Sequence, residues 1–423
     1  MLLKERDSNG KKADFIEEIA RTSFHTKTLI NISRYEDLSL QYTAIVSNLK
    51  NQIKSMTKDL LSDLKSTLSE RIMILDGAMG TTIRGYGLTE IEARGDRFIK
   101  NHEDLLNNGD ILSLTCPDVI ADIHKRFYEA GSDICETNTF SGTVLAQSEF
   151  FVEDPRKSGG KKDPEFFDQK VLNNSQLQDL VHELNIQSVK LAKQEADRIA
   201  NETGRPRYVA GAIGPLTVSL TNVSDPNDTS FRSVTFDQVK QTYRHQIDAL
   251  LEADCDILMV ETIFDSLNAK AALVAIKESG TKAPVIISAA VGRGGETMIS
   301  AQKVEALWNT FAHIDPLAIG LNCSLGPDLM EPFLRDLGKA ATTHISCYPN
   351  AGLPNPLAPT GFDLEPRHMH DYIAGFADDG LINLAGGCCG NTPEHIAAIA
   401  KSVEGKAPRQ IPVLAQAHPL QAS

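Results

Sequence analysis

The stretch DILMVETIFDSLNAKAALVAIKE, residues 256–278, places a short apolar run directly before a segment with helical spacing. The run 256–262 has the length and composition of a buried strand. From Ser266 to Glu278, apolar and polar residues follow one another at steps typical of a helix. A strand followed closely by a helix is the repeating unit of proteins with a parallel sheet. This stretch therefore predicts an α/β fold.

The same unit recurs along the chain after Arg71. Apolar runs lie at residues 72–76, 133–137, 208–214, 256–262, 284–291, 318–324, 344–350 and 382–389. Helix-compatible segments between them include 176–200, 236–252, 266–278, 304–310, 329–341 and 367–379. Eight strands that alternate with helices favour a closed barrel over a doubly wound sheet. We therefore predict a (β/α)8 TIM barrel over residues 71–412.

The first 70 residues have a different pattern. Between Ile45 and Leu68, apolar residues recur at steps of three or four, as in an amphipathic helix. The polar face of this helix carries both signs of charge, which favours a helix packed on one end of the barrel over a membrane-surface or calmodulin-binding helix. We predict an N-terminal helical extension at residues 1–70 and a linker-like tail at residues 413–423.

Composition limits the classes of partner. The 423 residues carry a formal net charge of -14, which argues against a general surface for nucleic acid or anionic membranes. No apolar stretch has membrane-spanning length, and the charged start MLLKERDSNGKK lacks the apolar core of a signal peptide. Seven cysteines, an odd number, suit a reducing compartment. We expect a cytoplasmic protein whose partners are small molecules or other proteins.

Chemically reactive side chains stand at the ends of the predicted strands. In a (β/α)8 barrel, the C-terminal ends of the strands and the loops after them form the active site. Buried polar groups at these positions are costly unless they have a function or a partner. The strand ends of this sequence carry Asp76, Glu136, Asn138, Glu261, Cys323, Asn350, Cys388 and Cys389.

Three cysteines at two strand ends point to a metal. Zinc binds Cys sulfur tetrahedrally, and three protein ligands leave a fourth position for water or substrate. Cys388 and Cys389 are adjacent, so they reach one ion only if the chain bends, which the flanking glycines permit. A vicinal disulfide or a redox pair are the alternatives. The remaining cysteines are interpreted as small hydrophobic residues: Cys116, Cys135, Cys255 and Cys347.

A glycine-containing turn follows the first strand, in LDGAMGTTI at residues 75–83. Its backbone N–H groups could hold an anion, but the turn lacks the lysine of a P-loop and the GxGxxG spacing, so a carboxylate fits better than a phosphate. Asp76 and Glu261 could pair with an ammonium group. Together with a thiophilic metal, these features suit an amino acid that carries a thiol. Alternatively, either carboxylate caps a helix or bonds the loop backbone.

Several longer motifs resemble a known family: RIMILDGAMGTTI (71–83), ETNTF (136–140), FDSLNAKAA (264–272), GLNCSLGP (320–327), PNAGLPN (349–355) and GGCCGNTPEHIAAI (386–399). They resemble the homocysteine-binding module of cobalamin-dependent methionine synthases, within the homocysteine S-methyltransferase family, and the resemblance runs from about Arg71 to Pro412. GLNCSLGP and PNAGLPN favour the cobalamin-dependent branch over the relatives that use betaine or S-methylmethionine.

The resemblance implies a zinc-dependent transferase of the methionine synthase type. Zinc would be held by Cys323, Cys388 and Cys389, with the homocysteine sulfur as the incoming ligand. As a zinc thiolate, homocysteine would accept the methyl group of methylcobalamin and become methionine. The substrate contacts that it implies are Asp76, Gly77, Ala78, Met79, Gly80 and Glu261, with Asn138 and Asn350 lining the pocket.

No cobalamin motif is present, so the resemblance also implies that methylcobalamin comes from another module or chain. The cobalamin-binding and folate-binding modules would act in trans or belong to a missing part of the same protein. Two alternatives stay open: a self-sufficient enzyme that uses S-methylmethionine or betaine, and a non-catalytic fragment.

Two stretches depart from the resembled family. GPLTVSLTNVS (214–224) stands where methionine synthases usually read GPTN, so the pocket wall there is expected to differ. Residues 152–167 are expected to form a surface loop.

Overall fold

The computed structural model describes residues 60–223, 225, 227–358 and 361–412. The chain divides into two units, residues 1–62 and 63–423, and only residues 60–62 of the first unit are among those described. Most of the predicted N-terminal extension, and the tail from residue 413, therefore lie outside the described residues. The boundaries 1–70, 71–412 and 413–423 stay predictions.

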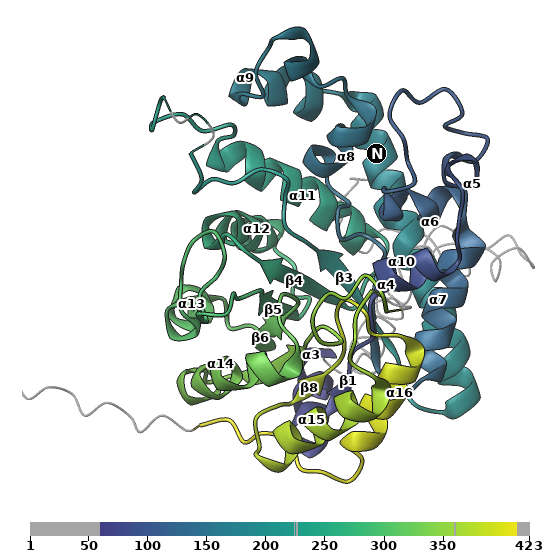
Figure 1. Ribbon diagram of the computed structural model, residues 1–423, viewed down its shortest axis with the longest axis vertical. Helices are drawn as coiled ribbons and strands as arrows, with labels where there is room; N and C mark the ends of the chain where they lie inside the picture. Colours follow the sequence, from purple (N-terminus) through teal and green to yellow (C-terminus); the bar gives the residue numbers. More distant parts are fainter. Residues whose placement is uncertain (1–59, 224, 226, 359–360, 413–423) are drawn as a thin grey trace, which may run out of the picture. The chain divides into compact units, whose positions relative to one another are not determined.

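Eight parallel strands form the barrel, one at each predicted run (Figure 1). Their order is β1-β8-β7-β6-β5-β4-β3-β2, and the bridge between Leu75 and Ile134 brings β1 beside β2. The predicted (β/α)8 fold is confirmed. The strands are β1 (Met73–Ile74), β2 (Ile134–Glu136), β3 (Tyr208–Ile213), β4 (Ile257–Ile263), β5 (Val285–Ala289), β6 (Ala318–Asn322), β7 (His344–Tyr348) and β8 (Leu384–Ala385).

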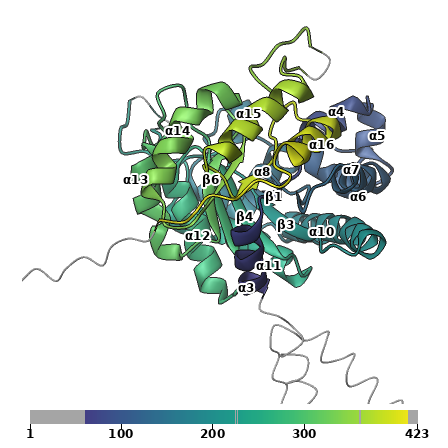
Figure 2. The ribbon, with the colours of Figure 1, turned by 90° about the horizontal axis from the view of Figure 1, so that it is seen from below.

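Helices surround the strands on the outside (Figure 2). The helices predicted from spacing are confirmed within three residues at each end. The α-helices are α3 (Leu60–Glu70), α4 (Met79–Gly85), α5 (Glu90–Arg94), α6 (Leu112–Thr115), α7 (Pro117–Glu129), α8 (Val144–Phe151), α9 (Pro164–Phe166), α10 (Ser175–Thr203), α11 (Phe236–Glu252), α12 (Ser266–Ser279), α13 (Val304–Phe311), α14 (Pro327–Ala340), α15 (Pro366–Asp378) and α16 (Pro393–Ser402). None of the helices in the described part of the chain is both long and apolar enough to cross a membrane.

The unit 256–278 shows how local sequence sets the alternation of strand and helix. All seven residues of β4 are buried, as expected for a strand with the barrel interior on one side and helices on the other. Asp265 then caps α12 by accepting a hydrogen bond from the N–H of Leu267. The helix ends at Gly280, whose φ of 71° suits a residue without a side chain.

α3 lies at the N-terminal ends of the strands. Leu64 and Leu68 are fully buried, and the carbonyl of Leu68 accepts a hydrogen bond from Asn383, which precedes β8. Lys65 lies 3.9 Å from Asp315, which precedes β6. Residues 63–70 of the predicted amphipathic helix therefore cover the end of the barrel opposite the strand mouths.

Residues 152–167 were expected to form a surface loop, and this prediction is only partly right. A 3-10 helix covers Pro155–Ser158, α9 follows at Pro164–Phe166, and a π-helix continues over Phe167–Leu172. The side chain of Phe167 is fully buried. Polar composition hid this helical segment because only a few of its residues, Phe167 among them, anchor it to the core.

Candidate active site

Three cysteines meet at the mouths of β6 and β8. Cys323 directly follows β6, and Cys388 and Cys389 follow β8 by three and four residues. The Sγ atoms of Cys323 and Cys389 are 3.9 Å apart, and all three sulfurs lie within 4.8 Å of one another. The cysteines predicted as metal ligands are therefore brought together, and the three sulfurs form a donor set of the kind that zinc binds.

The position of Cys323 depends on a strained backbone at the end of β6. Cys323 and Ser324 have φ angles of 57° and 60°, in the left-handed region that non-glycine residues seldom adopt. The preceding residue, Asn322, is fully buried and anchors this turn. Its side chain accepts hydrogen bonds from Ser288 and from the N–H of Thr262 and donates to the Thr262 hydroxyl, at 2.7 to 3.1 Å. Asn322 is thus a positioning residue that sequence analysis missed.

The loop after β8 is hydrogen-bonded to the segment that follows β7. The N–H of Cys388 donates to the carbonyl of Pro349 after β7, and the carbonyl of Cys389 accepts from the N–H of Ala351. At Gly390, φ is 81° and an added Cβ would lie 2.6 Å from the ring of Phe362. The chain therefore bends where the sequence predicted that adjacent cysteines need it to, and glycine is required there.

The three clustered cysteines form no disulfide in this structure. All seven cysteines lie among the described residues and all are free, so neither the vicinal disulfide nor a disulfide to Cys323 is present. Hydrogen bonds with Cys323 and then with Cys388 lower the pKa of the Cys389 thiol, whereas hydrogen bonds with Cys323 and then with Cys389 raise the pKa of the Cys388 thiol. Of the two adjacent thiols, that of Cys389 therefore has the lower pKa.

A cavity of about 480 Å³ opens in front of the cysteines. Its wall includes the predicted loop from Asp76 to Gly80, together with Asn138, Glu261 and the three clustered cysteines. It also includes Glu136, a strand-end residue that sequence analysis noticed but gave no role. Asn350 is buried beside Leu325, whose carbonyl accepts its N–H, and is not among the residues that line this cavity.

The loop after β1 is held against the loop after β8. The N–H of Ala78 donates to the carbonyl of Asn391, so this N–H is not free to bind an anion. The N–H of Gly387 donates to the carbonyl of Asp76. α4 begins at Met79, and the N–H groups of its first turn have no partner within the helix. The predicted anion-binding loop is therefore the start of a short helix that faces the cavity.

Of the five acidic residues that line this cavity, Asp76, Glu136 and Glu261 interact with one another. Asp76 Oδ2 accepts a hydrogen bond from the N–H of Glu136 at 3.0 Å, which joins the ends of β1 and β2. Burial, and then the charge of Glu136, raise the pKa values of Asp76 and Glu261, and burial raises the pKa of Glu136 to about 7. The cavity therefore disfavours three negative charges in the absence of a cation.

Asp76 also has two buried neighbours on its helix side. A carboxylate oxygen of Asp76, an imidazole nitrogen of His124 in α7 and the Sγ atom of Cys135 in β2 all lie within 4.8 Å of one another. Burial lowers the pKa of His124 to about 4, so its imidazole is neutral at pH 7 and brings no positive charge to Asp76. Cys135 is fully buried, as predicted for a small hydrophobic residue.

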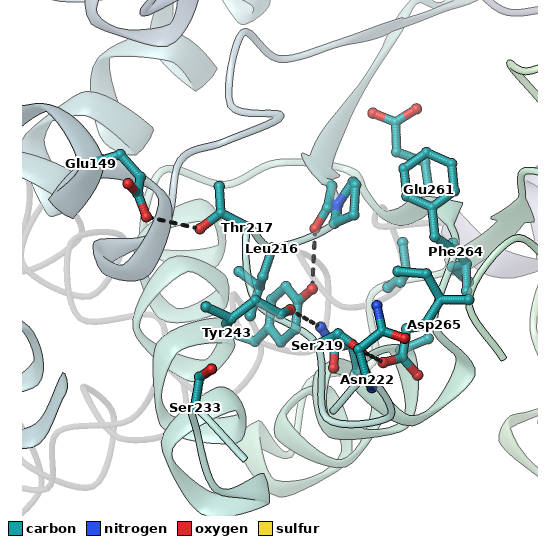
Figure 3. Close-up of a pocket in the computed structure, with 18 of the residues that line it drawn as sticks. Glu149, Leu216, Thr217, Ser219, Asn222, Ser233, Tyr243, Glu261, Phe264 and Asp265 are labelled. Carbon is teal, nitrogen blue, oxygen red and sulfur yellow. Dashed lines mark hydrogen bonds between the residues drawn. The ribbon is translucent and has the colours of Figure 1, made fainter. Parts of the chain in front are cut away.

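A second cavity of about 540 Å³ adjoins the first and shares Glu149, Thr217 and Glu261 with it. Its walls come from the loop after β3, where the sequence departs from the family pattern, and from the end of β4 (Figure 3). Thr217 donates to Glu149, and Ser219 donates to Asp265 at 2.6 Å. In this view the carboxyl group of Glu261 lies above Ser219 and Asp265.

Comparisons with known proteins agree with this geometry. The sequence model of homocysteine S-methyltransferases matches residues 73–403. The metallated form of the homocysteine methyltransferase MmuM from Escherichia coli has a TM-score of 0.57 at 20% identity, over 78% of this chain and 96% of that chain. The oxidized form of MmuM has a TM-score of 0.56 at 19% identity, over 78% of this chain and 95% of that chain. The apo form has a TM-score of 0.54 at 19% identity, over 79% of this chain and 96% of that chain. At these identities the likeness to MmuM shows the shared fold.

Proposed function

This chain belongs to the homocysteine S-methyltransferase family, and from that premise we propose that Cys323, Cys388 and Cys389 bind one zinc ion that prepares homocysteine for methylation to methionine. The observation that carries the proposal is the convergence of three free cysteines on the cavity at the barrel mouth. The three cysteines leave a fourth ligand position on the cavity side, where a substrate sulfur can enter.

The sulfur positions fit such an ion. Sulfur atoms at tetrahedral positions about 2.3 Å from zinc would lie roughly 3.8 Å apart. The 3.9 Å between Cys323 and Cys389 meets this expectation without movement of the chain. When bound, zinc would supply the positive charge that lowers the pKa of a ligating thiol, so that sulfur is a good nucleophile at neutral pH.

The remaining contacts of homocysteine follow from the cavity wall. Asp76 and Glu261 are buried carboxyl groups that can accept hydrogen bonds from the substrate ammonium group. The N–H groups at the start of α4, from Met79 and Gly80, can donate to the substrate carboxylate. With both ends of the amino acid held, the thiol is directed toward the cysteines.

The methyl donor in this proposal is methylcobalamin, carried by another module or chain. Its support is the resemblance of GLNCSLGP and PNAGLPN to the cobalamin-dependent branch. A second candidate is a small sulfonium or ammonium donor such as S-methylmethionine or betaine. The second cavity favours it, because this space of about 540 Å³ adjoins the homocysteine pocket at Glu261. Its wall carries both signs of charge, since Arg156 and Lys162 line it together with Glu149 and Asp265, and Lys162 pairs with Glu149.

One assay separates the donors. The zinc-loaded protein is incubated with homocysteine and methylcobalamin, S-methylmethionine or betaine in parallel, and methionine is quantified. Methionine formed from methylcobalamin supports the main proposal, and methionine formed from a small donor without corrinoid supports the second candidate. A Cys389→Ala protein serves as the control for uncatalysed transfer. Failure with every donor would contradict both.

A further inference from the structure

Glu136 occupies a place in the cavity that the proposed homocysteine contacts do not use. It ends β2, beside Asp76 at the end of β1, and its carboxyl group hydrogen-bonds to that of Glu261 from β4. Its N–H also holds Asp76 Oδ2 at 3.0 Å. Glu136 therefore contacts both carboxyl groups assigned to the substrate ammonium.

Among the described residues that line the cavity, no buried basic side chain balances these three acids. Of the residues that line the cavity, Arg84 is the one Lys or Arg, and its side chain is exposed. The shifts at the three carboxyl groups come from burial, mutual repulsion and hydrogen bonds, and none of their causes is a basic side chain. Buried carboxylates without a counter-charge are costly, so the cavity is built for a cation that arrives with a ligand.

We propose that Glu136 is a third recognition residue for the ammonium group of homocysteine, acting together with Asp76 and Glu261. An ammonium group has three N–H donors and one positive charge, and the three carboxyl groups all line the cavity and interact with one another. Charge-assisted hydrogen bonds of this kind give both affinity and selectivity, because a thiol without the amino group leaves the acids unpaired. The inference rests on the proposed function.

The test compares two thiols that differ only in the amino group, homocysteine and 4-sulfanylbutanoate. Their dissociation constants are measured by calorimetry on the zinc-loaded wild-type protein and on its Glu136→Gln variant. Gln keeps the size of the side chain but removes its charge. We expect Glu136→Gln to weaken homocysteine binding roughly tenfold or more and to leave 4-sulfanylbutanoate nearly unchanged, so that selectivity for the amino thiol falls.

Two further variants make the outcome decisive. Glu195→Gln alters a buried glutamate of α10 that pairs with Arg198 outside the cavity, and it should keep the wild-type selectivity. Glu136→Asp keeps the charge one methylene further back, and it should recover part of the selectivity even if Gln is poorly tolerated. Wild-type selectivity in both Glu136 variants would overturn the inference while leaving the proposed function intact. Failure of the wild-type protein to bind either thiol would overturn the proposed function and this inference together.

Discussion

Cys323 and Cys389 are 66 residues apart in the chain, yet their Sγ atoms lie 3.9 Å apart at the mouths of β6 and β8. This distance is nearly twice the length of a disulfide bond, about 2.05 Å, and it matches two ligands of one zinc ion. The two strand mouths are held in place by the barrel itself, since β7 pairs with both β6 and β8. The strand pairing of the barrel therefore sets the distance between the two sulfurs.

Replacing one ligand should release the metal without unfolding the barrel. We expect Cys323→Ala, Cys388→Ala and Cys389→Ala each to lose most of the zinc from a protein that otherwise binds about one ion, because two sulfurs hold zinc poorly. Metal analysis after gel filtration measures zinc, and circular dichroism checks the fold. Cys116→Ala, outside the cluster, should keep the metal. Stoichiometric zinc in a Cys388→Ala, Cys389→Ala double variant would refute the assignment.

Ammonium recognition and sulfur ligation should be separable. Asp76→Asn and Glu261→Gln remove a charge from the cavity but leave the cysteines untouched, so homocysteine should bind roughly tenfold or more weakly while zinc is retained. Calorimetry for homocysteine, together with metal analysis, measures both quantities on the same samples. If affinity stayed at the wild-type value in both variants, the two carboxylates would have only a structural role.

Homocysteine binding should release a proton. A thiol has to lose its proton to ligate zinc, so binding near neutral pH should release close to one proton per site from the thiol and should tighten as pH rises toward the thiol pKa of about 8.5. Methionine has a thioether with no proton to lose, and it should bind less well. Calorimetry in buffers of different ionisation enthalpy gives the proton count. Equal proton release and similar affinity for both ligands would exclude thiolate ligation.

The turn after β1 should tolerate a methyl group at one glycine but not at the other. A Cβ at Gly77 would lie 2.6 Å from the Phe127 ring and 2.8 Å from the carbonyl oxygen of Asn391, whereas a Cβ at Gly80 would meet no atom within 4 Å. Gly77→Ala should lower the free energy of unfolding by roughly 1–3 kcal/mol, and Gly80→Ala should change it little. Urea denaturation measures both, and equal stabilities would contradict the close packing at Gly77.

Asp110, buried in the cavity wall, should make stability depend on pH. Burial raises its pKa to about 7, although the N–H of Ser141 donates to its Oδ2 at 3.0 Å. The folded state therefore binds a proton more tightly than the unfolded state, and this contribution to stability is lost as pH rises from about 4 to about 7. Asn cannot ionise, so Asp110→Asn should gain stability relative to the wild type over this range. Urea denaturation at several pH values tests it, and a difference that does not vary with pH would show that Asp110 stays ionised.

Local patterns in the sequence were enough to predict the barrel. Each strand is a short apolar run and each major helix an amphipathic segment, and both signals depend on residues close together in the chain. The α11 prediction, Phe236–Glu252, matches the structure at both ends, and its start is set by the capping box that Thr235 and Gln238 form. By contrast, the helical segment at residues 164–172 was missed because contacts distant in sequence stabilise it.

The sequence by itself determined that reactive residues stand at strand ends, and it selected the three cysteines, because residue type and position along a strand are local properties. Only the tertiary structure decided which side chains share the cavity. It placed Glu136 against Asp76 and Glu261, and it left Asn350 outside the lining of the same cavity. The physical reason is that the direction of a side chain at a strand mouth depends on backbone angles and hydrogen bonds from neighbouring strands. The left-handed turn at Cys323 and its anchor Asn322 show this dependence.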